Sequence, residues 1–148
     1  MWLYNDIELD ESLLDSHIGF VYKITNLEDD RIYIGKKLFK FKRSKKVKGK
    51  TKKVLVESDW KKYWGSNKIL IEDVKELGED KFRREILRLC KAKGEMNYYE
   101  AKYQFELGVL ESNSAYNEWI MVKVHKAHLK KVDFSDRFDI ISLYNMKE

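Results

Sequence analysis

The chain has 148 residues, of which 43% are hydrophobic and 14% aromatic, and this is typical of one folded domain rather than of a disordered chain. Its single cysteine, Cys90, excludes an internal disulfide, and no apolar run approaches the ~18 residues of a membrane helix. The net charge is +5, and the acidic N-terminus lacks the pattern of a signal peptide, so we expect one soluble, cytoplasmic domain over residues 1–148.

Two neighbouring segments near the N-terminus are predicted to form a β-hairpin. Residues 18–26 are rich in β-branched and aromatic side chains, and residues 27–30 (LEDD) are typical of a turn. The sequence RIYIG at residues 31–35 predicts the returning strand.

The register of this hairpin decides how two tyrosines lie. Only an odd sum of paired residue numbers places Tyr22 and Tyr33 on the same face of an antiparallel hairpin. If Asn26 pairs with Arg31, Gly35 lies opposite Tyr22, and the two phenols are diagonal neighbours beside a bare glycine. That space would suit a phosphate or a water molecule. The alternative is that these are ordinary strand residues.

The next segment, residues 36–58, is intensely basic. Residues 31–56 contain twelve Lys or Arg and no acid. The rest of the chain contains 18 basic and 25 acidic residues, so its net charge is about −7. Such a segment attracts a polyanion, for which phosphate is the obvious candidate; the alternative is a solvated lysine-rich loop. Residues 36–42 alternate and could extend the strand, and residues 48–50 (KGK) could form a turn from which residues 52–58 pair back.

Two helices and a third strand are predicted further along the chain. Ser66 is a good helix N-cap, and apolar residues at helical spacing follow it until Gly78. Residues 82–90 favour a strand, and the spacing in residues 96–108 favours a second helix. After Asn117 we expect another strand and a terminal helix or strand. The order β-β-α-β-α indicates a small α/β domain.

Several residues, taken in order, resemble the signature of the GIY-YIG nuclease family. Residues 19–22 (GFVY) are similar to the first half of that signature, with one extra residue before the tyrosine, and residues 33–35 (YIG) to the second half. Arg43, eight residues after the YIG glycine, resembles the family's arginine. Glu100, in the second predicted helix, resembles its glutamate, and Asn117, after a tyrosine, resembles its asparagine.

The resemblance covers roughly residues 18–120 and implies both a fold and an activity. Residues 59–66 (DWKKYWGS) are similar to a segment common in phage-encoded members. The implied fold is an α/β domain with a small three-stranded antiparallel sheet flanked by helices. Residues 36–58 would then be a basic insertion after the second strand, and residues 121–148 a C-terminal extension. The implied activity is phosphodiester hydrolysis with one divalent metal, Mg²⁺ or Mn²⁺.

The resemblance also implies a role for each motif residue. Glu100 would bind the metal, because one carboxylate with waters and phosphate oxygens is a normal Mg²⁺ arrangement. Arg43 would contact the scissile phosphate, although other basic residues nearby are alternatives, as are other glutamates for Glu100. Tyr22 would be the general base or orient the attacking water, and as a base it needs a cation to lower its pKa from ~10. Tyr33 would position the water or a neighbouring side chain, and Asn117 would orient Glu100 or close the site.

Double-stranded DNA is the expected substrate, and lysines of the basic insertion are expected to track its backbone with little base specificity. These lysines are Lys36, Lys37, Lys45, Lys46, Lys48, Lys50, Lys52 and Lys53. Lys36 is also expected to contact the phosphate in the active site. No zinc finger or helix-turn-helix pattern is present, so the basic insertion and the C-terminal extension would recognise the target. Cleavage of both strands by one single-site domain requires a homodimer or two nicking events.

Other function classes fit part of this pattern. A non-catalytic nucleic-acid-binding module would keep the lysines but need not keep Tyr22, Glu100 and Asn117 together. A structural protein that binds an acidic partner gives no reason for the ordered motif. RNA is an alternative substrate, and homing, restriction and repair are alternative roles.

Overall fold

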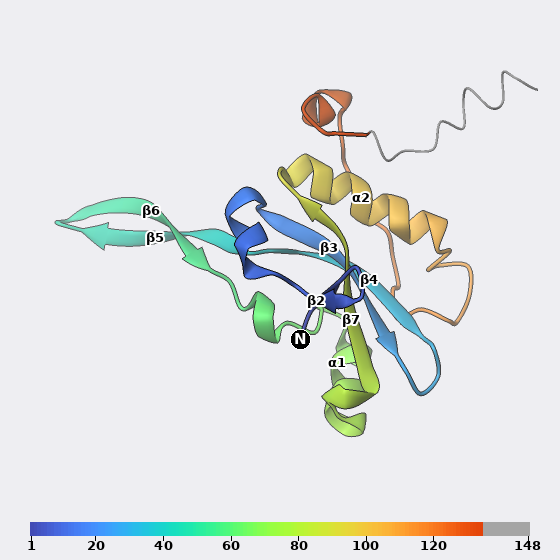
Figure 1. Ribbon diagram of the computed structural model, residues 1–148. Helices are drawn as coiled ribbons and strands as arrows, with labels where there is room; N and C mark the ends of the chain where they lie inside the picture. Colours follow the sequence, from blue (N-terminus) through green and yellow to red (C-terminus); the bar gives the residue numbers. More distant parts are fainter. Residues whose placement is uncertain (135–148) are drawn as a thin grey trace, which may run out of the picture.

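Three long antiparallel strands, built from the segments richest in β-branched and aromatic residues, form the centre of the fold (Figure 1). This computed structural model describes residues 1–134. The strands are β1 (Leu3–Tyr4), β2 (Ile7–Glu8), β3 (Gly19–Asn26), β4 (Ile32–Leu38), β5 (Lys40–Val47), β6 (Lys50–Glu57) and β7 (Phe82–Cys90). The α-helices are α1 (Lys68–Leu77) and α2 (Lys93–Glu106), and short 3-10 helices cover Glu11–Ser16, Trp60–Lys62, Glu79–Lys81 and Lys126–Leu129. No helix in this described part is long and apolar enough to cross a membrane.

The main sheet has five strands in the order β2-β1-β7-β3-β4, so the expectation of three strands was wrong. The three expected strands are present, but β1 adds to β7 in parallel and β2 pairs back on β1. Each added strand has two residues, which is too short for a recognisable alternating pattern. Burial of Trp2 and Leu9, which flank them, holds this N-terminal segment against the sheet.

The β3–β4 hairpin has the register that its sequence predicts. The backbone N–H of Asn26 donates to the carbonyl of Arg31 at 2.9 Å, and Tyr22 lies opposite Gly35. The second strand continues to Leu38, three residues beyond the predicted end. Because β4 is the last strand of the order, one of its sides is an edge of the sheet.

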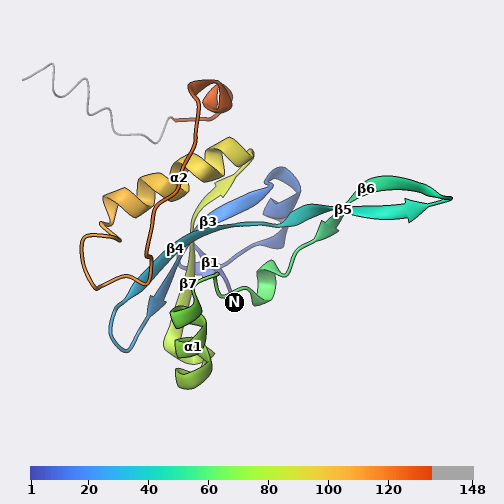
Figure 2. The same ribbon diagram turned by 180° about the vertical axis from the view of Figure 1, so that it is seen from behind.

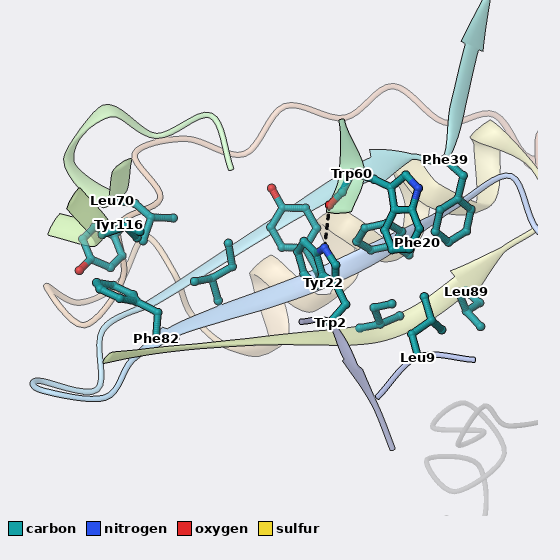
Figure 3. Packing of buried hydrophobic residues seen from close by; sticks show 13 residues of the cluster. Trp2, Leu9, Phe20, Tyr22, Phe39, Trp60, Leu70, Phe82, Leu89 and Tyr116 are labelled. Atoms are coloured by element: carbon teal, nitrogen blue, oxygen red, sulfur yellow. Dashed lines mark hydrogen bonds between the residues drawn. The ribbon is translucent and has the colours of Figure 1, made fainter. Parts of the chain in front are cut away.

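Helices cover both faces of this sheet (Figures 1 and 2). On one face, Met96 and Tyr99 of α2 pack with Val21. On the other face, Phe20 and Tyr22 belong to a larger cluster that includes α1, the N-terminal segment and the 3-10 helix at Trp60–Lys62 (Figure 3). Successive residues of β3 therefore enter two different cores, as side chains of a strand do.

The helix ends were predicted in part. Gly78 ends α1 with a φ of 95°, as expected. The N-cap of α1 is Asn67 rather than Ser66: Asn67 Oδ1 accepts from the N–H of Leu70 at 2.9 Å, while Ser66 bonds to Tyr33. The sequence could not separate two adjacent capping residues, since both are good N-caps.

The strand expected after Asn117 is absent from residues 118–134, which contain only the short 3-10 helix at Lys126–Leu129. Residues 114–117 already occupy the edge of β4, with the N–H of Ile32 donating to Ser114 and the N–H of Tyr116 donating to Ile32. That edge is thus not available to a further strand. The rest of the expected terminal helix or strand lies outside the described residues.

A second hairpin, β5–β6, forms its own two-stranded sheet and projects from the rest of the molecule (Figures 1 and 2). Its turn lies at Lys48 and Gly49, with φ values of 51° and 77°, as the KGK sequence predicted. The hairpin carries most of the basic segment as a β-ribbon rather than as an irregular loop.

Candidate active site

A cavity of about 460 Å³ lies at the edge of β4, where the two faces of the sheet meet. Its lining residues are Tyr33, Lys36, Ser66, Asn67, Lys68, Ile69, Glu100, Gln104, Asn117, Glu118, Trp119 and Met121. Four of them, Tyr33, Lys36, Glu100 and Asn117, are residues that the sequence analysis singled out. The structure brings these four around one space although they come from β4, α2 and the segment after α2.

Tyr22, Tyr33 and Tyr63 gather beside this cavity, and we refer to them as the tyrosine cluster. The ring centroid of Tyr22 is 6.2 Å from that of Tyr33 and 6.1 Å from that of Tyr63. A Cβ at Gly35 would overlap the Tyr22 hydroxyl and lie 3.0 Å from Cε1 of Tyr33, so only glycine leaves room here. Tyr22 and Tyr63 share a hydrogen bond, and Ser66 bonds to Tyr63 and, at 3.0 Å, to the Tyr33 hydroxyl.

Tyr22 is almost fully buried, with 1% of its surface exposed. Burial raises the pKa of its phenol well above the usual value, and the hydroxyls of Tyr63 and Tyr33 raise it further. Burial also raises the pKa of Tyr63. The chain by itself therefore does not give Tyr22 the lowered pKa that a tyrosine base needs.

Glu100 projects from α2 into the cavity, with about 16% of its side chain exposed. Its Oε1 lies 3.4 Å from Nζ of Lys36, which also donates to Oδ1 of Asn97 at 2.5 Å. Burial raises the pKa of the Glu100 carboxyl, and the ammonium of Lys36 acts in the opposite direction. This carboxyl is thus poorly hydrated and partly neutralised by one cation.

The other glutamates of α2 have different surroundings. Glu95 is buried and accepts a hydrogen bond from the N–H of Lys91, at the start of the helix. Glu106 is exposed beside Lys102, away from the cavity. Within residues 1–134, no three His, Cys, Asp or Glu side chains are grouped so that they could hold a metal ion by themselves. A metal at Glu100 would therefore need waters and substrate oxygens as further ligands.

Asn117 contacts the backbone of β4 rather than Glu100. Its Oδ1 accepts from the N–H of Ile34 at 3.0 Å, and its Nδ2 donates to the carbonyl of Ile34 at 2.9 Å. The side-chain amide thus pairs with Ile34 as a neighbouring peptide group would. Gln104 also donates to this carbonyl, at 3.3 Å. Asn117 fixes the strand between Tyr33 and Gly35, and so positions the cavity wall.

A polar network around Tyr116 holds Asn117 in place. The Tyr116 hydroxyl donates to Oδ2 of Asp73 at 2.7 Å and accepts from Asn26 at 2.9 Å. Arg31 pairs with the same Asp73 oxygen at 2.7 Å and stacks over the Tyr116 ring at 4.3 Å. Burial raises the pKa of Tyr116 to about 12, so its hydroxyl stays a donor at neutral pH. The network links the β3–β4 turn, α1 and the segment after α2.

The chain matches, over residues 2–120, the family model described as "Putative endonuclease segE, GIY-YIG domain". The chain belongs to the GIY-YIG family. This membership implies nuclease activity at a general level, and it confirms the resemblance to the phage-type members. No curated protein and no solved structure matches the chain.

Arg43 does not join the cavity in this GIY-YIG chain. It lies on β5 opposite Val54, exposed, with its guanidinium 4.8 Å from the Phe41 ring centroid. It lies seven positions after Lys36 along a largely extended chain, which corresponds to roughly 20 Å. The cations among the cavity-lining residues are Lys36, which was expected to contact the phosphate, and Lys68, which was not expected in the site.

The lysines expected to bind DNA fall into three settings. Lys36 lines the cavity, whereas Lys37 pairs with Asp59 at 2.6 Å and lies 3.8 Å from the ring centroid of Tyr63. The remaining six are exposed on β5–β6: Lys45, Lys46, Lys48, Lys50, Lys52 and Lys53. Lys37 thus supports the tyrosine cluster, and the hairpin displays the rest.

Sequence reasoning missed several residues of the site. Ser66 was interpreted as a helix cap and Tyr63 was given no role of its own in the site, but both join the hydroxyls of the tyrosine cluster. Their signal was available, because both lie in the 59–66 segment that resembles phage-encoded members. Gln104 and Trp119 carried no recognisable signal.

Proposed function

We propose that the chain is a DNA endonuclease in which residues 1–148 act as one nuclease domain and the cavity beside β4 receives the scissile phosphate. The meeting of Tyr33, Lys36 and Glu100 in one cavity of a GIY-YIG chain carries this proposal. A hydroxyl, an ammonium and a carboxylate are the groups needed to orient a water, neutralise a phosphate and bind a cation.

Glu100 is the residue that would hold one divalent metal, Mg²⁺ or Mn²⁺. The donor set fits such an ion, because the carboxylate faces a cavity of about 460 Å³ with room for waters and phosphate oxygens. When bound, the ion would act as a Lewis acid on the phosphate. Lys36 would then exchange its contact with Glu100 for one with a phosphate oxygen.

Tyr33 is the phenol best placed to orient the attacking water, since it lines the cavity and Ser66 fixes its hydroxyl. Tyr22 lies behind it, buried and bonded to Tyr63. The raised pKa of Tyr22 favours an orienting role over that of general base. Asn117 acts indirectly, by holding the backbone of Ile34.

The β5–β6 hairpin would bind the DNA backbone beside the cleaved bond. Its eight exposed lysines and Arg43 form a ribbon of one sign of charge, and such charge gives affinity for phosphates in any sequence. Arg43 would thus act on flanking phosphates from the hairpin, while Lys36 is the cation at the scissile phosphate.

A plasmid-cleavage assay tests the proposal. Supercoiled plasmid is incubated with the wild-type chain, with Glu100→Gln or with Glu106→Gln. Each is assayed with Mg²⁺, with Mn²⁺ and with EDTA. We expect metal-dependent nicking or linearisation by the wild type and by the Glu106→Gln control, and a loss of at least 100-fold in Glu100→Gln. Retained cleavage by Glu100→Gln would overturn the metal assignment, and Glu118→Gln is then the next variant, because Glu118 also lines the cavity. If the chain binds plasmid but cleaves no duplex or RNA substrate, the result would favour the non-catalytic binding module.

A further inference from the structure

The cavity is also lined by apolar side chains that the proposed chemistry does not use. Ile69, Trp119 and Met121 line the same cavity as Lys36 and Glu100. These three are 48%, 70% and 73% exposed. Apolar side chains gathered at the rim of a polar site mark a surface that a ligand covers.

Trp119 differs from the other tryptophans of the chain. Trp2 and Trp60 are 3% exposed and lie in the main core, and Trp64 packs against that core. No ring contact or hydrogen bond of the Trp119 side chain is found within residues 1–134. It lies two residues after Asn117, whose side chain is bonded to Ile34, and it lines the cavity.

The size of the cavity indicates what Trp119 meets. A volume of about 460 Å³ is typical of pockets that bind small organic ligands and exceeds the needs of a phosphate group alone. A phosphate at Lys36 carries a deoxyribose and a base on either side. A base has a flat apolar face that stacks on aromatic side chains whatever its sequence.

We propose that Trp119 is a stacking platform for the base of a nucleotide next to the scissile phosphate, flanked by Ile69 and Met121. This inference rests on the proposed function, since it places the phosphate at Lys36 and Glu100. The base must leave its neighbours to lie on the indole, which is easiest in single strands and beside damaged or mismatched positions. Trp119 would thus position the phosphodiester and favour locally unstacked DNA.

Fluorescence titration without divalent metal tests the inference independently of cleavage. The full chain is titrated with a 12-nucleotide single strand, an intact 20-base-pair duplex and the same duplex with one abasic site, for the wild type, Trp119→Phe and Trp119→Leu. We expect quenching of tryptophan emission by the single strand, and its loss in both variants. We expect Trp119→Leu to bind roughly 5- to 150-fold more weakly, and Trp119→Phe to retain most of the affinity, because phenylalanine still stacks.

Phe105→Leu is the matched control, because Phe105 is an aromatic residue that is 64% exposed on α2 and does not line the cavity. Its affinity should equal that of the wild type. If Trp119→Leu cleaves and binds DNA as the wild type does, the stacking role is overturned and the nuclease proposal stands. Quenching and a Trp119 dependence without any cleavage would keep the stacking role and reject the nuclease. A chain that binds none of the three DNAs would reject both.

Discussion

The three glutamates of α2 show that the surroundings of a residue, rather than its type, decide its role. Glu95 is bonded to the N–H of Lys91 at the start of the helix, and Glu106 lies in water beside Lys102. Glu100 alone of the three faces the cavity, where burial outweighs the cation beside it and raises the pKa of its carboxyl. A buried carboxylate with a single ammonium partner is unfavourable in the free protein and is favoured by a bound cation.

Replacing Glu100 with glutamine should therefore stabilise the metal-free protein at neutral pH. Because the pKa of Glu100 is higher in the folded than in the unfolded chain, its contribution to stability is present at acidic pH and is lost as the pH rises through the raised folded-state value. Glutamine carries no charge, so the variant does not lose this stability as the pH rises. We expect the Tm of Glu100→Gln to exceed that of the wild type at pH 7 to 8 and to approach it near pH 4, measured by thermal unfolding in EDTA.

The control for this prediction is Glu106→Gln, whose exposed carboxylate is paired only at 3.8 Å with Lys102. Its Tm should change little at any pH. If Glu100→Gln is less stable than the wild type at neutral pH, the contact with Lys36 outweighs the effect of burial.

At the scale of the element, the β5–β6 hairpin is a structure whose charges oppose its own formation. Lys45 lies directly opposite Lys52, and like charges at such positions destabilise a ribbon. No residue of its outer half belongs to either core cluster, and an isolated two-stranded ribbon is marginally stable in water. A polyanion would remove this repulsion, as the proposed binding of DNA by the hairpin requires.

The double variant Lys45→Gln, Lys52→Gln should bind duplex DNA more weakly and with less dependence on salt. The slope of log K against log salt concentration should become shallower by roughly 0.9 for each phosphate contact that is lost. The matched control is Lys75→Gln, Lys91→Gln, which removes two exposed lysines outside the hairpin and leaves the same net charge. Equal slopes for the two double variants would mean that the hairpin is only solvated.

The sequence predicted those elements whose information is local. The β3–β4 register followed from the turn between Asn26 and Arg31, and the end of α1 followed from Gly78. The N-terminal strands were missed because their pairing depends on β7, about 80 residues away along the chain. In the candidate site, the motif singled out Glu100, which lines the cavity. The partner of Asn117 is the backbone of Ile34, and a pattern of side chains does not indicate a contact with backbone.

At the scale of the whole molecule, the N-terminal segment supports the tyrosine cluster through one buried cation. The guanidinium of Arg84 lies between the rings of Trp2 and Trp64, at 4.6 and 4.2 Å from their centroids. It donates to the carbonyls of Lys61 and Tyr63, at 3.2 and 2.8 Å. Burial lowers the pKa of Arg84 to about 10, so it remains charged at neutral pH. The position of Tyr63 thus depends on residues from the start of the chain.

Trp2→Ala should accordingly destabilise the protein and loosen the site together. Trp2 packs against Phe20 and Tyr22, with ring centroids at 4.9 and 5.2 Å, and its indole N–H donates to the carbonyl of Trp60 at 2.7 Å (Figure 3). Loss of a buried tryptophan lowers the free energy of unfolding by about 3–5 kcal/mol, which denaturant titration measures.

The control is Ile7→Ala, in the same segment but 69% exposed, which should change the free energy of unfolding by less than about 0.5 kcal/mol. Below the Tm of the variant, cleavage by Trp2→Ala should still be slower than that of the wild type, because Arg84 then lacks one of the two rings that enclose it and holds Tyr63 less firmly. Wild-type cleavage by a destabilised but folded Trp2→Ala would separate the two effects and show that the N-terminal segment stabilises the fold without positioning the tyrosine cluster.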